Sequence, residues 1–121
     1  IASSVAHDSH NLIAVGVNDR EIEKSVMEII RMKGGQVVVA DEEVIASLPL
    51  PIAGLISDRP IEEVTMKVKD LIDASKKIGS VLDNPFMALS FLSLPVIPEM
   101  KITDKGLVDV EKFRIVPLFG E

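Results

Sequence analysis

The segment 34–51 constrains the fold of this chain more than any other stretch of the sequence. Residues 36–40 form a short valine-rich run that is typical of a strand, and two glycines separate it from a preceding helical pattern. After three polar residues, the apolar run 44–48 can pair back on the first strand as a hairpin. Pro49 and Pro51 lack backbone N–H donors, so this part of the chain must follow a sheet edge or leave the sheet.

Helical patterns lie on both sides of this hairpin. Asn18 precedes residues of helical apolar spacing and can cap the first turn, with Glu21 as the reciprocal partner of a capping box. Residues 60–78 form the longest amphipathic pattern, for which Asp58 is the candidate cap. Residues 84–92 can form a short helix that is apolar nearly all round, as expected for a helix that is buried or contacts another domain.

Four further runs are predicted to be strands: 11–17, 101–103, 107–110 and 113–118. Residues 52–56 are predicted to be a buried loop or a short segment. Because hairpins dominate this order of elements, we expect an α+β fold: a mixed or largely antiparallel sheet with two main helices packed on one of its faces. The length of 121 residues predicts a single domain, 1–121.

Composition argues against several classes of function. The net charge is −6, and the sequence has no basic stripe of the kind that binds nucleic-acid phosphates. No apolar run reaches the ~18 residues that a membrane-spanning helix requires, so we expect no membrane partner. The chain has no cysteine, which fits a cytoplasmic protein and excludes disulfide and thiolate chemistry. It begins with isoleucine, so we expect a fragment of a longer polypeptide.

The segment 3–11 concentrates the groups that could bind a metal or move a proton. It contains both histidines of the chain, His7 and His10, with Asp8 and Ser9 between them. Histidine ordinarily titrates near neutral pH, so it can take up or release a proton. The apolar run that follows places these polar side chains at the mouth of a predicted strand, where they are the first candidates for a functional site.

Three interpretations of this segment are open. Residues three apart face the same way on a helix or turn but opposite ways in a strand, so a metal shared by His7 and His10 would require a bend, with Asp8 as a further ligand. The two histidines could instead act in proton transfer or contact a substrate. They could also be purely structural, as residues that satisfy backbone groups where the strand begins.

Acidic pairs and glycines elsewhere have structural explanations. Three pairs could be proposed as general acid and base: Asp19 with Glu21, Glu42 with Glu43, and Glu62 with Glu63. Two of these pairs fall where helices start and the third falls in a turn, so we expect them to match helix dipoles and a turn instead. Gly34 and Gly35 follow a helix and precede a strand, which is the reverse of a phosphate-binding loop.

Two segments, 48–57 and 84–99, are too apolar for ordinary exposed loops. Either the domain buries them itself, or they remain at the surface as an interface. In the second case the chain could pack on another domain or form a homo-oligomer.

Several long motifs of this sequence resemble one family. They are SSVAHDSHN (3–11), LPLPIAGLIS (48–57), PFMALSFLSLPVIP (85–98) and LVDV (107–110). In this order they are similar to the carboxy-terminal domain of prokaryotic adenine deaminase, a member of the amidohydrolase superfamily. The resemblance extends from Ile1 to Phe119, which is nearly the whole chain.

The resemblance implies a hydrolase of purine metabolism that converts adenine and water to hypoxanthine and ammonia, by breaking a C–N bond in a cyclic amidine. It implies a divalent metal, Mn or Fe, in an upstream (β/α)8 barrel that this chain does not contain. We therefore expect no metal or other cofactor in this fragment and no activity from the fragment alone. The upstream barrel and adenine are the expected partners, and His7, Asp8, Ser9 and His10 are expected to help enclose the active site at the mouth of the barrel.

A non-catalytic module is the competing interpretation. A small α+β domain can act in folding, in oligomerisation or in binding a small ligand, and the apolar segment 84–98 favours an interface. Such a module would keep its effect on assembly when both histidines are replaced, whereas a contributor to catalysis would not.

Overall fold

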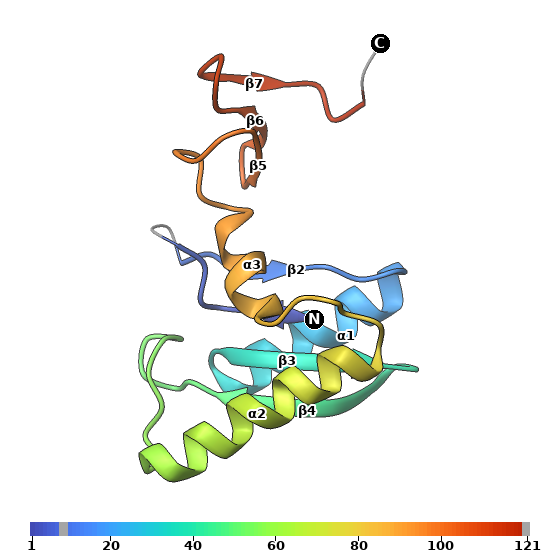
Figure 1. Ribbon diagram of the computed structural model, residues 1–121, viewed down its shortest axis with the longest axis vertical. Helices are drawn as coiled ribbons and strands as arrows, with labels where there is room; N and C mark the ends of the chain where they lie inside the picture. Colours follow the sequence, from blue (N-terminus) through green and yellow to red (C-terminus); the bar gives the residue numbers. More distant parts are fainter. Residues whose placement is uncertain (8–9, 120–121) are drawn as a thin grey trace.

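The computed structural model describes residues 1–7 and 10–119, and these residues form three helices and two antiparallel sheets (Figure 1). The helices are α1 (Asp19–Met32), α2 (Ile61–Lys77) and α3 (Pro85–Phe91). The first sheet contains β1 (Ala2–Ser3), β2 (Ile13–Ala14), β3 (Gly35–Ala40) and β4 (Glu43–Pro49). The second contains β5 (Met100–Thr103), β6 (Gly106–Asp109) and β7 (Arg114–Val116). The predicted α+β class is confirmed.

Helices cover both faces of the first sheet, whose strand order is β2-β1-β3-β4. Val38 of β3 belongs to a buried cluster with Leu71 of α2, whereas Val37 and Val39 are buried with Ile29 of α1. Figure 1 shows α2 crossing in front of β3 and β4, with α1 on the other side. The prediction that both helices share one face is wrong, because β3 is a central strand and its continuous valine run is apolar on both sides.

The predicted hairpin is confirmed as β3 and β4, in the register that pairs Ala40 with Glu43. Its turn residues, Asp41 and Glu42, have positive φ angles of 52° and 61°, as in a type I′ turn. This turn type matches the twist of the strands, so two acidic residues adopt it here although Asn-Gly is the commoner choice. As the prolines predicted, β4 is an edge strand and ends at Pro49.

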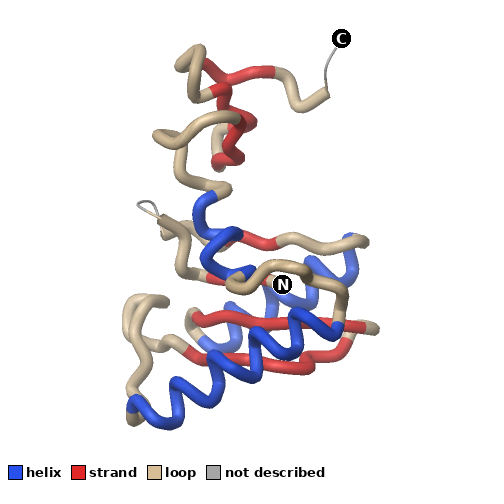
Figure 2. Tube along the Cα trace, in the orientation of Figure 1, coloured by secondary structure: helices blue, strands red, loops and turns tan. Residues whose placement is uncertain are grey.

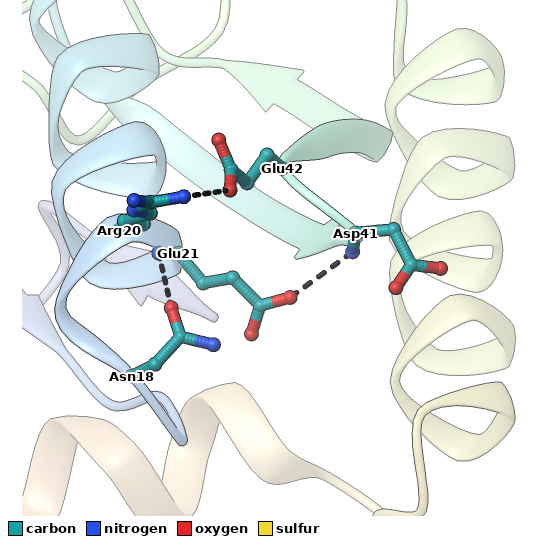
Figure 3. Close-up of polar contacts among 5 residues, drawn as sticks. All are labelled: Asn18, Arg20, Glu21, Asp41 and Glu42. Atoms are coloured by element: carbon teal, nitrogen blue, oxygen red, sulfur yellow. Dashed lines mark hydrogen bonds and ion pairs between the residues drawn. The ribbon is translucent and has the colours of Figure 1, made fainter.

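The N-terminus of α1 is tied to this turn, as Figure 3 shows. The Asn18 side chain accepts a hydrogen bond from the Glu21 N–H at 3.0 Å, so the predicted cap is confirmed. The Glu21 carboxylate accepts from the Asp41 N–H at 3.0 Å, and Arg20 reaches Glu42 at 3.5 Å. The reciprocal half of the capping box is therefore wrong, because the open N–H of the turn competes for the same carboxylate.

The other two predicted helices are confirmed, with a difference at the start of α2. Pro60 occupies its N-cap position, and Asp58 forms an exposed ion pair with Arg59 at 3.6 Å. Asp58 lies two residues before the cap, out of register with the first helical N–H groups. At the start of α3, the Asn84 side chain accepts a hydrogen bond from the Met87 N–H at 3.1 Å and so caps the helix.

The strand predicted over 11–17 is much shorter in the structure. Only Ile13 and Ala14 form β2, because the partner strand β1 also has only two residues. The Val15 N–H still donates to the Ile1 carbonyl at 2.9 Å, but the side chains of Val15 and Val17 are exposed. The second half of the predicted strand therefore has a backbone hydrogen-bond partner at Ile1, but the described part of the domain leaves its valine side chains exposed.

The segment 52–56 forms a small exposed hairpin, so the prediction of a buried loop is wrong. Ile52 and Ile56 pair across it and are both exposed. Ala53 and Gly54 occupy the turn with φ angles of 57° and 74°, which places the two isoleucines side by side at the surface. Burial within 48–57 is confined to its start, where Leu48 and Leu50 belong to the core.

The second sheet projects from the body of the domain beyond α3, with the strand order β5-β6-β7 (Figure 2). One backbone hydrogen bond, from the Ile102 N–H to the Leu92 carbonyl at 2.9 Å, ties β5 to the end of α3. The three predicted strands of this region are found, although the last is shorter and spans only Arg114–Val116. Among the described residues, helices fall short of the length and apolarity needed to cross a membrane.

Candidate functional site

The histidine-bearing segment forms the loop between β1 and β2, called here the histidine loop (residues 5–12). It lies at the end of the first sheet that also carries the 52–56 hairpin (Figure 1). The His10 N–H donates to the Ala6 carbonyl at 2.9 Å, and His10 has a φ angle of 47°. The backbone of His10 therefore lies close to that of Ala6. Two predicted site residues, Asp8 and Ser9, lie outside the described residues.

Ser4 fixes the base of the histidine loop. Its hydroxyl donates to the Gly54 carbonyl at 2.6 Å and accepts from the Gly35 N–H at 2.8 Å. A Cβ atom on Gly34 would collide with the Cα atom of Gly54, so three loops meet at a point where only glycines fit. Sequence reasoning missed this role of Ser4, and the only signal was the pair of glycines between a helix and a strand.

His7 is held against α3. Its imidazole stacks on the ring of Phe91 with centroids 4.6 Å apart and 22° between the planes. The backbone N–H of His7 donates to the Ser90 carbonyl at 3.3 Å. The side chain is half-buried and lines a hollow of about 260 Å³ together with Gln36 and Asn84. His7 therefore packs against α3 beside a mostly apolar hollow.

His10 has a different environment, because it is exposed at the outer end of the loop. Across residues 1–7 and 10–119, no three His, Cys, Asp or Glu side chains come together in a group that could hold a metal ion. The structure thus places one predicted histidine on the domain and the other at the surface. The arrangement suits a loop that presents groups to something outside the domain.

The acidic pairs lie at the starts of two helices and in the hairpin turn, as predicted. Asp19 and Glu21 lie in the first turn of α1, and Glu62 and Glu63 lie in the first turn of α2. Glu42 lies in the hairpin turn beside Arg20. Their positions match the positive ends of helix dipoles and an exposed ion pair.

Among residues 1–7 and 10–119, two carboxylates have shifted pKa values, and both belong to ion pairs. Arg31 donates to the Glu28 carboxylate at 2.6 and 2.8 Å, and these bonds lower the pKa of Glu28. Lys112 donates to the Asp109 carboxylate at 2.8 Å through its side chain and at 3.0 Å through its backbone N–H, which lowers the pKa of Asp109. A lowered pKa suits a structural ion pair and not a general acid, which must carry a proton.

Comparison with known proteins identifies one family. The family model described as adenine deaminase C-terminal domain matches residues 1–114. The chain is 56% identical over 121 residues to an adenine deaminase of Methanothrix thermoacetophila, and 52% identical over 119 residues to one of Desulfatibacillum aliphaticivorans. It is 55% identical over 120 residues to adenine deaminase 2 of Carboxydothermus hydrogenoformans.

These similarities cover 98% to 100% of this chain but only 21% of each of the three relatives. The chain therefore spans about a fifth of the length of the curated relatives that it matches. The resemblance seen in the sequence motifs is confirmed for the family.

Proposed function

Because the chain belongs to the adenine deaminase C-terminal domain family, we propose that it is the C-terminal part of an enzyme that hydrolyses adenine to hypoxanthine and ammonia. The observation that carries this proposal is the match over residues 1–114, together with identities above 50% to proteins named adenine deaminase. The remaining four fifths of such an enzyme would contain the upstream barrel. A cytoplasmic location is proposed with it, in keeping with a sequence that has no cysteine.

The divalent metal, Mn or Fe, belongs in this proposal to the upstream barrel. The residues described in this chain do not fit a metal, because their His, Asp and Glu side chains gather in no group of three. His7 is already stacked on Phe91, and His10 stands apart at the surface. The part of this chain in catalysis would therefore be to bind, orient or enclose, and the barrel would supply the metal.

The histidine loop, with His7, Asp8, Ser9 and His10, is proposed to face the barrel mouth and to help enclose adenine. Two features support this: the loop has a rigid base at Ser4, and it carries an exposed imidazole at His10. In the hydrolysis, the C–N bond to the amino group breaks and a proton must reach the leaving ammonia. An imidazole placed there can deliver that proton or hydrogen-bond a ring nitrogen of the base.

Replacing the histidines in the full-length enzyme tests this role. We expect His10→Ala to lower kcat/KM for adenine by about 100-fold, the typical contribution of a positioned acid or base. At position 7, His7→Phe keeps an aromatic ring against Phe91 and removes the ring nitrogens, whereas His7→Ala removes both. Lys105→Ala, at an exposed position in the turn after β5, is the control for nonspecific effects.

A structural role of His7 and a chemical role give opposite results in this comparison. Activity lost in both His7→Phe and His7→Ala assigns the effect to the imidazole nitrogens. Activity kept in His7→Phe and lost in His7→Ala assigns it to packing. Wild-type turnover in the His7→Ala and His10→Ala enzymes would contradict the proposed role of the loop.

A second candidate, an oligomerisation module, is favoured by one observation. Large apolar side chains of the second sheet, among them Met100, Ile102 and Ile115, are exposed. A homo-oligomer could cover them. This role would survive replacement of both histidines, so the mass of the assembly in the double variant distinguishes it from the first.

A further inference from the structure

An apolar groove opens beside β1 and β2, on the side of the domain that faces α3. It has a volume of about 490 Å³ and is lined by aliphatic side chains, among them Ile1, Val17, Leu82 and Leu92. Val17 is one of the lining residues and is 91% exposed. An exposed aliphatic groove of this size is typical of a site that binds another segment or partner.

The backbone of β1 points to that occupant. Ile1 and Val15 exchange two hydrogen bonds, from the Ile1 nitrogen to the Val15 carbonyl and from the Val15 N–H to the Ile1 carbonyl, each at 2.9 Å. They continue the antiparallel register that pairs Ala2 with Ala14. The ladder therefore runs on past the named strand, and its next positions lie opposite Gly16 and Val17.

We propose that, in the full-length protein, the residues immediately before Ile1 extend β1 along Gly16 and Val17 and close this groove. The proposal rests on one part of the proposed function, that a longer chain precedes this domain, as in relatives about five times its length. In this register the first residue before Ile1 lies opposite Gly16, and the second lies opposite Val17. The junction between the two parts of the enzyme is thus a continuous strand.

Alternation along the strand fixes which side chain enters the groove. Ile13, Val15 and Val17 lie on one face, on which Ile13 packs with Leu89 of α3. The second residue before Ile1 lies on that same face, so its side chain points into the groove. The first residue points to the opposite face, where Ala2 packs against α1.

Cysteine labelling of the full-length enzyme tests the proposal. On a background without other reactive cysteines, Val17→Cys should react with a maleimide at least about tenfold more slowly than Val81→Cys, because an added strand would cover it. Val81 is the matched control: it is also a valine, is 94% exposed and does not line the groove. A second pair of cysteines, at Val17 and at the second residue before Ile1, should form a disulfide under mild oxidation, since directly opposite residues lie within disulfide reach.

The register has its own control. A cysteine at the first residue before Ile1 should form little disulfide with Val17→Cys, because its side chain would point to the opposite face of the strand. Rapid labelling of Val17→Cys, equal to that of Val81→Cys, would overturn the proposal. Slow labelling without the disulfide would also overturn it, because another segment or a second copy would then fill the groove.

Adenine hydrolysis measured on the same preparations separates the two proposals. An active enzyme with a freely labelled Val17→Cys leaves the proposed function standing and removes the extended strand. A slowly labelled, disulfide-forming protein that does not hydrolyse adenine keeps the strand and contradicts the function.

Discussion

The two sheets of this domain differ in how far the apolar side chains of their strands are buried. In the first sheet, β3 lies between α1 and α2, and its valines are buried on both faces. In the second sheet, Met100, Ile102 and Ile115 remain exposed, and a single backbone bond from Ile102 ties β5 to α3. The first sheet therefore forms the core of the fold, whereas the second sheet leaves large apolar side chains exposed.

The largest expected effect is a contrast in stability between these two sheets. Leu71 is 0% exposed against β3, so Leu71→Ala should lower the free energy of unfolding by about 2–5 kcal/mol. Ile102 is 50% exposed, so Ile102→Ala should change it by no more than about 1 kcal/mol. Urea unfolding of the purified chain measures both. Equal losses would contradict the distinction between a core and a free surface.

The next effect concerns the junction of loops at Ser4. Ser4→Ala leaves the Gly35 N–H and the Gly54 carbonyl without their shared partner, which should cost about 1–3 kcal/mol. Ser80→Ala is the control, because that hydroxyl accepts only one exposed hydrogen bond, from the Leu82 N–H at 3.3 Å. If both variants unfold at the same urea concentration, Ser4 does not hold the histidine loop in place.

The smallest effect is a pH dependence that arises at Asp109 in the second sheet. The bonds from Lys112 lower the pKa of Asp109, so they stabilise the fold above the ordinary aspartate pKa of about 3.9. That contribution is lost as the pH falls through the lower pKa of the folded state. Lys112→Met should therefore raise the pKa of Asp109 toward its ordinary value, measured by NMR titration of the carboxyl carbon. An unchanged pKa would show that the side-chain bond is not its cause.

Local signals in the sequence predicted the elements of the fold well. Asn18 caps the helix that it was expected to cap, α3 begins near Asn84 as expected, and the prolines after Leu48 place β4 at an edge. These features depend on neighbouring residues, so a linear pattern contains them. The family resemblance was likewise visible in motifs, because long runs such as residues 85–98 are distinctive.

Features that depend on distant contacts could not be predicted in this way. Both faces of β3 consist of valines from one continuous run. The sequence therefore did not reveal that a helix lies on each side of the strand. The partner of Glu21 is the N–H of Asp41, twenty residues away, and the partner of Ser4 is Gly54, fifty residues away. At the histidine loop, the bend at His10 and the stacking of His7 on Phe91 likewise required the structure.

The most direct test of the central claim is a comparison of adenine hydrolysis by the full-length enzyme and by a version that ends just before Ile1. We expect that the shortened enzyme still binds its metal but loses most of its turnover, and that adding residues 1–121 as a separate chain restores part of it. Full turnover by the shortened enzyme, or hydrolysis by residues 1–121 alone, would contradict the claim that this domain completes an active site built on the upstream barrel.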